Sequence, residues 1–125
     1  MAFKPTPQQE LAINTNGSLL VSAAAGSGKT AVLVERVIRL LTDDKNPVPA
    51  DKLLVITFTN AAAAELKLRI EKKLNEIMEN SPYSPLLQKQ KILMSNAKIC
   101  TIDSFCLDFI RENYEIYGFD EIFIL

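Results

Sequence analysis

The sequence predicts an α/β fold in which a parallel sheet carries helices on its faces. Two observations lead to this class. Short apolar runs alternate along the chain with longer segments whose apolar residues recur at helical spacing. The run 53–58 is apolar on both faces, which is typical of a strand inside a parallel sheet. Three such runs make a small sheet, so we expect it to be part of a larger one.

The N-terminal half predicts a helix, a strand, a loop and a second helix. Residues 6–9, Thr-Pro-Gln-Gln, predict a helix start because they supply an N-cap, a Pro at the first helical position and a Gln at the third. Asn16-Gly17 predicts a turn, and the apolar run 18–22 predicts the first strand. A helix follows the loop 23–30, with an apolar stripe of Val34, Val37, Ile38 and Leu41. It ends before Pro47, which cannot continue the hydrogen-bond ladder.

The second strand, 53–58, leads into a long helix. Asn60 can cap this helix, and Pro82 ends it. Its apolar stripe is Leu66, Ile70, Leu74, Ile77 and Met78. The remaining expected elements are a helix over 86–95, a strand over 99–102 and a helix over 105–117 that Gly118 ends as a C-terminal cap.

The composition favours one packed domain and excludes several classes of protein. The 125 residues are 48% hydrophobic with only 4 Gly and 6 Pro, which excludes a low-complexity chain. Lys and Arg number 14 against 15 Asp and Glu, so any polyanion site must be local. No apolar run approaches the roughly 20 residues of a membrane span, and the N-terminus does not resemble a signal peptide. We therefore expect a cytoplasmic protein without membrane contact.

The chain has no histidine and two cysteines, Cys100 and Cys106. The absence of histidine excludes Ser-His and Cys-His catalysis and argues against a zinc site. Two cysteines six residues apart within one apolar segment predict reduced thiols in the core of a cytosolic protein.

Residues 26–30, Gly-Ser-Gly-Lys-Thr, carry the strongest chemical signal and lie between a predicted strand and a predicted helix. Glycines let successive backbone N–H groups turn toward one phosphate, and the helix that begins there adds the positive end of its dipole. In such a loop Lys29 would reach the β- and γ-phosphates, and the Thr30 hydroxyl would bind Mg²⁺. The alternative is a glycine-rich turn beside a solvated lysine. A strict form of the motif has Gly where this chain has Ala23.

Gln9 has two interpretations. Its side chain can return to the backbone of Thr6 and complete a capping box, which the spacing favours. Alternatively, its amide can read an adenine base, because it offers both a donor and an acceptor.

Residues 57–60, Thr-Phe-Thr-Asn, follow the second strand at the end where ligands bind in open α/β sheets. Hydroxyls, an amide and an aromatic ring suit a single-stranded nucleic acid, which needs phosphate contacts and a stacking surface. Equally, Phe58 could belong to the core and Asn60 could only cap the helix. The nearby cations indicate a solvated helix face rather than a DNA patch; they are Lys67, Arg69, Lys72 and Lys73.

Asp103 decides between the alternatives for catalysis. Nucleoside triphosphatases with this loop need an acid after a second apolar strand to hold Mg²⁺. Residues 99–103, Ile-Cys-Thr-Ile-Asp, imitate that pattern, with Thr101 as the misfit. If Asp103 binds the metal, the chain could be a self-contained small P-loop NTPase or kinase.

Three segments together resemble the start of a UvrD/Rep-type superfamily 1 helicase, most closely the A-subunit family of bacterial ATP-dependent helicase/nucleases. The segments are 20–36, 54–66 and 101–106, in the family's order and at similar spacing. The resemblance implies a three-layer P-loop NTPase (RecA-like) motor domain with a parallel sheet. It also implies that 1–125 is only the N-terminal part of the first such domain, since the family's Asp-Glu pair, arginine fingers and second motor domain are absent from these residues.

The resemblance also implies roles for individual residues. Gln9 would read adenine, Lys29 and Thr30 would be catalytic, and Thr30 would hold Mg²⁺. The ATP-binding loop would be Ala23, Ala24, Ala25, Gly26, Ser27, Gly28, Lys29 and Thr30, and the family often has Ala at the first of these. The path of single-stranded DNA would include Phe58, Thr59, Asn60, Ser104 and Phe105. The family usually has His in place of Asp103, which argues that Asp103 is not the metal-binding acid.

The function that the resemblance implies is ATP-driven translocation on DNA and its unwinding, in double-strand-break repair and recombination. The cofactors would be ATP and Mg²⁺. The partners would be single- and double-stranded DNA and the helicase/nuclease B subunit, which would form the other half of a heterodimer. Besides the self-contained NTPase, a non-enzymatic module that signals by nucleotide occupancy remains an alternative. Residues 57–60 favour the helicase, because neither alternative needs them.

Overall fold

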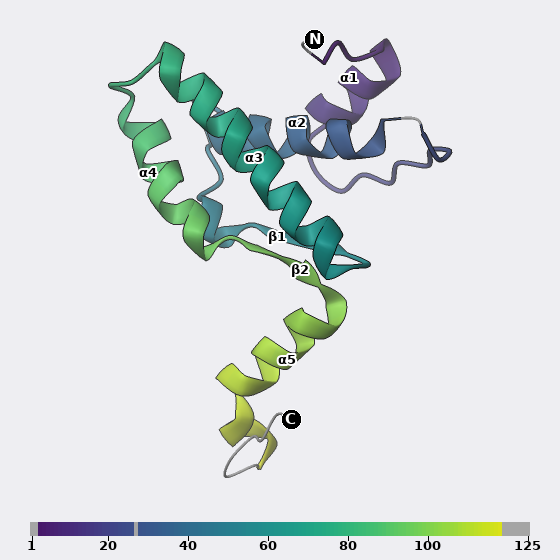
Figure 1. Cartoon of the computed structure of the whole chain (residues 1–125), viewed down its shortest axis with the longest axis vertical. Helices are drawn as coiled ribbons and strands as arrows, with labels where there is room; N and C mark the ends of the chain where they lie inside the picture. Colours follow the sequence, from purple (N-terminus) through teal and green to yellow (C-terminus); the bar gives the residue numbers. More distant parts are fainter. Residues whose placement is uncertain (1–2, 27, 119–125) are drawn as a thin grey trace.

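The computed structural model describes residues 3–26 and 28–118 (Figure 1). Its main helices and strands are α1 (Pro7–Asn14), α2 (Lys29–Thr42), β1 (Leu54–Thr57), α3 (Asn60–Asn80), α4 (Pro85–Leu93), β2 (Lys98–Thr101) and α5 (Ile102–Glu112). Short 3-10 helices lie at Ala50–Lys52, Met94–Asn96 and Tyr114–Tyr117. The expected alternation of strands and helices is confirmed from residue 29 onward.

The sheet of the described residues has two parallel strands. β1 and β2 pair with Leu54 opposite Lys98 and Thr57 opposite Thr101. The expected strand over 18–22 was a wrong prediction, since this segment pairs with no described residue. An apolar run indicates a tendency to extend, but a strand forms only where a neighbour accepts its backbone hydrogen bonds. Leu20 is accordingly 96% exposed.

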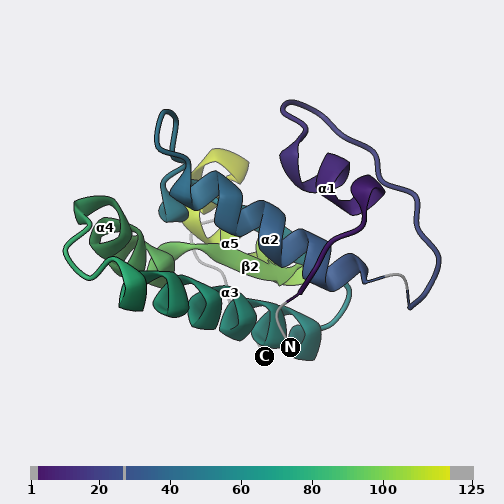
Figure 2. The ribbon, with the colours of Figure 1, turned by 90° about the horizontal axis from the view of Figure 1, so that it is seen from above.

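Two helices cover one face of the sheet. α2 and α3 lie side by side and pack against each other, and α3 contacts both strands (Figure 2). The core is built from these two helices together with β1, α4 and the segments that connect them. Its members are Val34, Val37, Ile38, Leu41, Ala50, Val55, Leu66, Ile70, Leu74, Leu87, Met94 and Ala97. The stripes expected on both helices are thereby confirmed. A 2.8 Å ion pair between Glu35 and Lys73 joins the two helices at the margin of this core.

The opposite face of the sheet is more open. Leu54 and Ile56, whose side chains alternate with that of buried Val55, are 46% and 43% exposed. α5 contacts both strands from this side (Figure 1), but the exposure of Leu54 and Ile56 means that the described residues do not confirm the expected three-layer arrangement. The prediction of two core thiols is also partly wrong. Cys100 and Cys106 are both free, as expected, but Cys106 is exposed.

Local chemistry sets the helix starts. Thr59, and not Asn60 as expected, caps α3, because its hydroxyl accepts from the Ala62 N–H at 3.1 Å. The last helix begins at Ile102, earlier than expected, since Thr101 acts as its N-cap. After α5 the chain tightens into a 3-10 turn that ends at left-handed Gly118. Within the described ranges, none of the helices is both long and apolar enough to cross a membrane.

Candidate functional site

The glycine-rich loop opens directly into α2. Gly26 and Gly28 have φ values of +77° and +82°, the left-handed region that favours glycine. Gly28 is the N-cap of α2, and within the described residues no side-chain hydrogen bond caps this helix. Uncapped N–H groups at the positive end of a helix dipole are suited to an anion. Ala23, Ala24 and Ala25 are exposed, and Ser27 lies outside the described residues.

Lys29 and Thr30 form the first turn of α2, and both are exposed. The ammonium group of Lys29 donates to the carbonyl oxygen of Ala23 at 3.3 Å, so the side chain folds back over the loop. A cation held across the loop by one long hydrogen bond can exchange that carbonyl for a phosphate oxygen.

Gln9 completes the predicted capping box and also faces this loop. Its Oε1 accepts from the Thr6 N–H at 2.9 Å, and the Thr6 hydroxyl accepts from the Gln9 N–H at 3.3 Å. A β-carbon built on Gly28 would lie 3.2 Å from Gln9 Nε2. The structural interpretation of Gln9 is thus confirmed. The same side chain nevertheless borders the glycine-rich loop.

A cavity of about 480 Å³ lies between α1, the segment before the loop and the first half of α2. Polar groups line it at the loop and at the start of α1, and apolar side chains lie between them. The lining includes Thr6, Gln9, Val21, Lys29, Val32 and Leu33. A pocket of this size, mostly apolar with a few polar groups, is typical of sites for small organic ligands.

Thr30 is the residue that fits a magnesium ion at this loop. Among the described residues, no group of three or more His, Cys, Asp or Glu is placed to hold a metal. Mg²⁺ at nucleotide sites takes most of its ligands from phosphates and water and few from protein. The exposed hydroxyl beside Lys29 suits that role. Asp103 lies in the first turn of α5, where a carboxylate stabilises the helix dipole.

The second predicted site lies at the carboxyl edge of the sheet. Since Thr57 and Thr101 are paired in the parallel register, residues 58–60 and 102–105 leave the two strands at the same edge. Phe58 is fully exposed at 104%, which excludes the interpretation that it belongs to the core. α2 and α3 also begin on this side of the molecule (Figure 1).

Three of the four remaining residues predicted to contact DNA have local contacts, namely Thr59, Ser104 and Phe105. Thr59 caps α3, and Asn60 begins that helix and is exposed. The Ser104 hydroxyl accepts from the Thr101 hydroxyl at 2.9 Å. Phe105 packs against Phe109 with ring centroids 6.2 Å apart.

Comparison with known proteins decides the family. Residues 5–124 match the UvrD/REP helicase N-terminal domain. The chain belongs to this helicase family. It is 53% identical over 121 residues to the A subunit of the ATP-dependent helicase/nuclease of Clostridium perfringens and 55% identical over 121 residues to that of Clostridium beijerinckii. Both alignments cover 96% of this chain and 10% of the relative.

A relative from another genus gives a similar match. The corresponding subunit of Thermoanaerobacter sp. is 52% identical over 124 residues, which cover 98% of this chain. The chain thus spans only 10% of the length of each of these curated relatives.

Sequence reasoning missed one residue of this helicase domain. Arg36 on α2 lines the same cavity as Gln9 and Lys29 and is hydrogen-bonded to the C-terminal end of α1. A lone arginine inside a helical stripe carries no local signal for a contact more than twenty residues away in sequence. Its role becomes visible only when the two helices are packed together.

The cations of α3 take structural roles in two cases. Arg69 pairs with Glu65 one turn before it, and Lys73 pairs with Glu35 of α2. These pairs support the interpretation of a charged helix face rather than a DNA patch.

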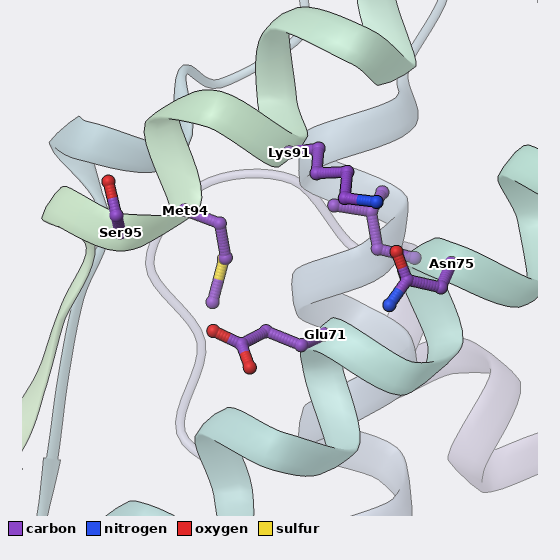
Figure 3. Close-up of a pocket in the computed structure, with 6 residues that line it drawn as sticks. Glu71, Asn75, Lys91, Met94 and Ser95 are labelled. Carbon is purple, nitrogen blue, oxygen red and sulfur yellow. The ribbon is translucent and has the colours of Figure 1, made fainter.

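A smaller cavity of about 220 Å³ lies between α3 and the end of α4. Figure 3 shows Glu71 and Met94 pointing toward one another, with Lys91 and Asn75 nearby. None of the predicted site residues lines this cavity. We therefore assign it no part in the nucleotide or nucleic-acid sites.

Proposed function

We propose that this chain is the ATP-binding part of the A subunit of a DNA helicase/nuclease. In this proposal the protein uses ATP hydrolysis to translocate on and unwind DNA in double-strand-break repair and recombination. The observation that carries it is the cavity that joins Gln9 to the glycine-rich loop and Lys29. Family membership supplies the class of reaction, and the cavity supplies a place for the nucleotide.

The nucleotide would lie along this cavity. The triphosphate would bind the N–H groups of 23–30 and the start of α2, with Lys29 exchanging the Ala23 carbonyl for the β- and γ-phosphates. Thr30 would contribute its hydroxyl to Mg²⁺, which neutralises phosphate charge during transfer. Gln9, at the start of α1, would read adenine. Its amide nitrogen borders the loop, and its Oε1 would have to exchange the Thr6 N–H for the base.

Single-stranded DNA would cross the carboxyl edge of the sheet. Fully exposed Phe58 offers a stacking surface for a base, and the polar groups nearby offer contacts to phosphates. We assign this path to Phe58, Thr59, Asn60, Ser104 and Phe105. Because the relatives are named as subunits, we also propose that a B subunit is the partner and that double-stranded DNA is the substrate that is unwound.

Residues 1–125 would form the N-terminal portion of a three-layer RecA-like motor domain. The half-exposed face around Leu54 and Ile56 is apolar, as expected for a sheet that a further layer of helices covers. ATP would close two such domains on Lys29, and hydrolysis would reopen them. An arginine supplied from a second domain contributes about 10³ to 10⁵ in rate in related enzymes, so the chain alone should hydrolyse little ATP.

The test is nucleotide binding and phosphate release by the chain with ATP and Mg²⁺, with and without single-stranded DNA. We expect measurable ATP binding, which Lys29→Ala reduces at least about tenfold because a charge-assisted contact to phosphate is lost. Lys45→Ala, which removes an exposed cation from the turn after α2, should bind ATP normally. Turnover that needs no DNA and disappears in Asp103→Asn would instead establish a self-contained NTPase.

A further inference from the structure

Arg36 holds the C-terminal end of α1. Its Nη1 donates to the carbonyl oxygens of Ala12 at 2.7 Å and Thr15 at 2.8 Å, and lies 3.5 Å from that of Ile13. The last carbonyls of a helix lack partners within the helix and carry the negative end of its dipole. A partly buried guanidinium that satisfies them is therefore a specific connection between α1 and α2.

α1 packs along α2 and depends on that packing for its position. It has only eight residues, too few to be stable without packing, and buries Ala12 and Ile13. The segment that leads from it to the loop, 16–26, is exposed throughout. A second connection, from Arg39 to the Asn16 side chain at 2.9 Å, is exposed and lies beyond the helix. Arg36 thus contributes partly buried hydrogen bonds that join α1 to α2.

The two helices joined by Arg36 carry the two ends of the proposed nucleotide site. Gln9 is on α1, and Lys29 begins α2 two turns before Arg36. We propose that Arg36 is a positioning residue for base recognition, which keeps Gln9 in register with the phosphate-binding loop and so sets the preference for adenine over guanine. This inference rests on the proposed function, because it requires a nucleotide in the cavity.

The chemistry of the two bases explains why position matters. A glutamine amide can pair with adenine through one donor and one acceptor, whereas the corresponding edge of guanine presents two acceptors. That discrimination requires α1 to be correctly placed. Binding of the triphosphate needs only the loop and the start of α2. Loss of Arg36 should therefore weaken base discrimination and spare the phosphates.

The experiment compares dissociation constants for ATP, GTP and inorganic triphosphate, measured on the chain and on Arg36→Ala. We expect the preference for ATP over GTP to fall roughly tenfold, the scale of one bidentate base contact, with triphosphate affinity unchanged. Arg39→Ala is the matched control, because it removes only the exposed contact to Asn16, and it should keep the preference. An unchanged preference in Arg36→Ala would overturn the inference, as would an equal loss of affinity for all three ligands.

A double-mutant cycle separates positioning from general stability. If Arg36 acts through Gln9, adding Arg36→Ala to Gln9→Ala should leave the ratio of ATP to GTP affinity unchanged. With Gln9 present, Arg36→Lys should keep more of the preference for ATP than Arg36→Ala does. If Arg36→Ala reduced the preference for ATP in the Gln9→Ala variant as much as it does in the native chain, Arg36 could not be acting by positioning Gln9. If Gln9→Ala alone left the preference unchanged, the adenine-reading role in the proposed function would fail. If Gln9→Ala lowered the preference for ATP but Arg36→Ala did not, the positioning role of Arg36 would be overturned while the adenine-reading role of Gln9 would stand.

Discussion

The side-chain amide nitrogen of Gln9 lies against the backbone of Gly28, so that a β-carbon at position 28 would be 3.2 Å from it. The N-terminal helix and the glycine-rich loop are therefore in contact, although eighteen residues lie between these two positions in the sequence. The loop needs glycine here for two reasons, the left-handed φ of +82° and the approach of Gln9.

Gly28→Ala should weaken ATP binding by more than about tenfold. A left-handed alanine costs about 1–2 kcal/mol, and relief of that strain moves the N–H groups that would hold phosphate. Gly17→Ala is the control, because its φ of +80° brings the same strain while nothing lies within 4 Å of the new methyl group. Equilibrium binding of ATP to both variants measures the effect. Equal ATP affinity in the two variants would contradict it.

Phe58→Ala should reduce affinity for single-stranded DNA roughly tenfold, since base–aromatic stacking contributes about 1–3 kcal/mol for each base. The fully exposed ring buries nothing, so the free energy of unfolding should change by less than about 0.5 kcal/mol. Tyr83→Ala is the control, because Tyr83 is 91% exposed on the turn between α3 and α4. Fluorescence anisotropy with a labelled oligonucleotide would distinguish the two. An equal effect of both substitutions would remove the stacking role.

Local patterns predicted most of the elements. The capping box at Thr6 and Gln9 depends on residues three apart, and the structure has it as expected. The strands at 53–58 and 99–102 were predicted to within one residue at each end. The cap of α3 was predicted one residue late, because Thr and Asn are both good N-caps and the sequence places them side by side.

What the sequence could not predict depends on tertiary contacts. The run 18–22 has the composition of a strand, yet whether it pairs depends on a neighbouring strand that no local pattern specifies. Arg36 reads as an ordinary helical cation until α1 is packed on α2. Phe58 could equally have been core or surface, and only the fold places it fully outside.

Asp43 should make the chain less stable in acid. Backbone N–H groups of Asn46 and Lys45 donate to its Oδ1 at 2.8 and 2.9 Å, and they hold the pKa of Asp43 below its ordinary value of 3.8. A lowered folded-state pKa stabilises the fold above the unfolded-state value, and this contribution is lost as pH falls through the folded-state value.

Two measurements check the prediction for Asp43. An NMR titration of the carboxyl group should give a pKa below 3.8. Asp43→Asn should unfold more readily than the native chain at about pH 6, and the difference should shrink as the pH falls through the folded-state pKa of Asp43, where the carboxyl group becomes neutral. A difference that persists unchanged in acid would assign the effect to something other than this charge.

Gln90 should be the polar side chain whose loss most destabilises the core of the described residues. It is 2% exposed; its Oε1 accepts from the Ala50 N–H at 2.9 Å, and its Nε2 donates to the carbonyls of Leu41 and Val48 at 2.7 and 2.8 Å. It thereby ties α4 to the end of α2 and to the 3-10 turn before β1.

Gln90→Met keeps the volume of this side chain but removes its polar atoms, leaving two buried backbone groups and one partly buried group without partners. Each unsatisfied group costs about 1–3 kcal/mol, so the free energy of unfolding in urea should fall by about 3 kcal/mol or more. Gln88→Met, on the exposed face of the same helix, removes only a bond to the Pro82 carbonyl and should cost less than about 1 kcal/mol. Similar losses in the two variants would mean that water or a shifted backbone satisfies the groups around position 90, and that the three bonds are not what joins α4 to the core.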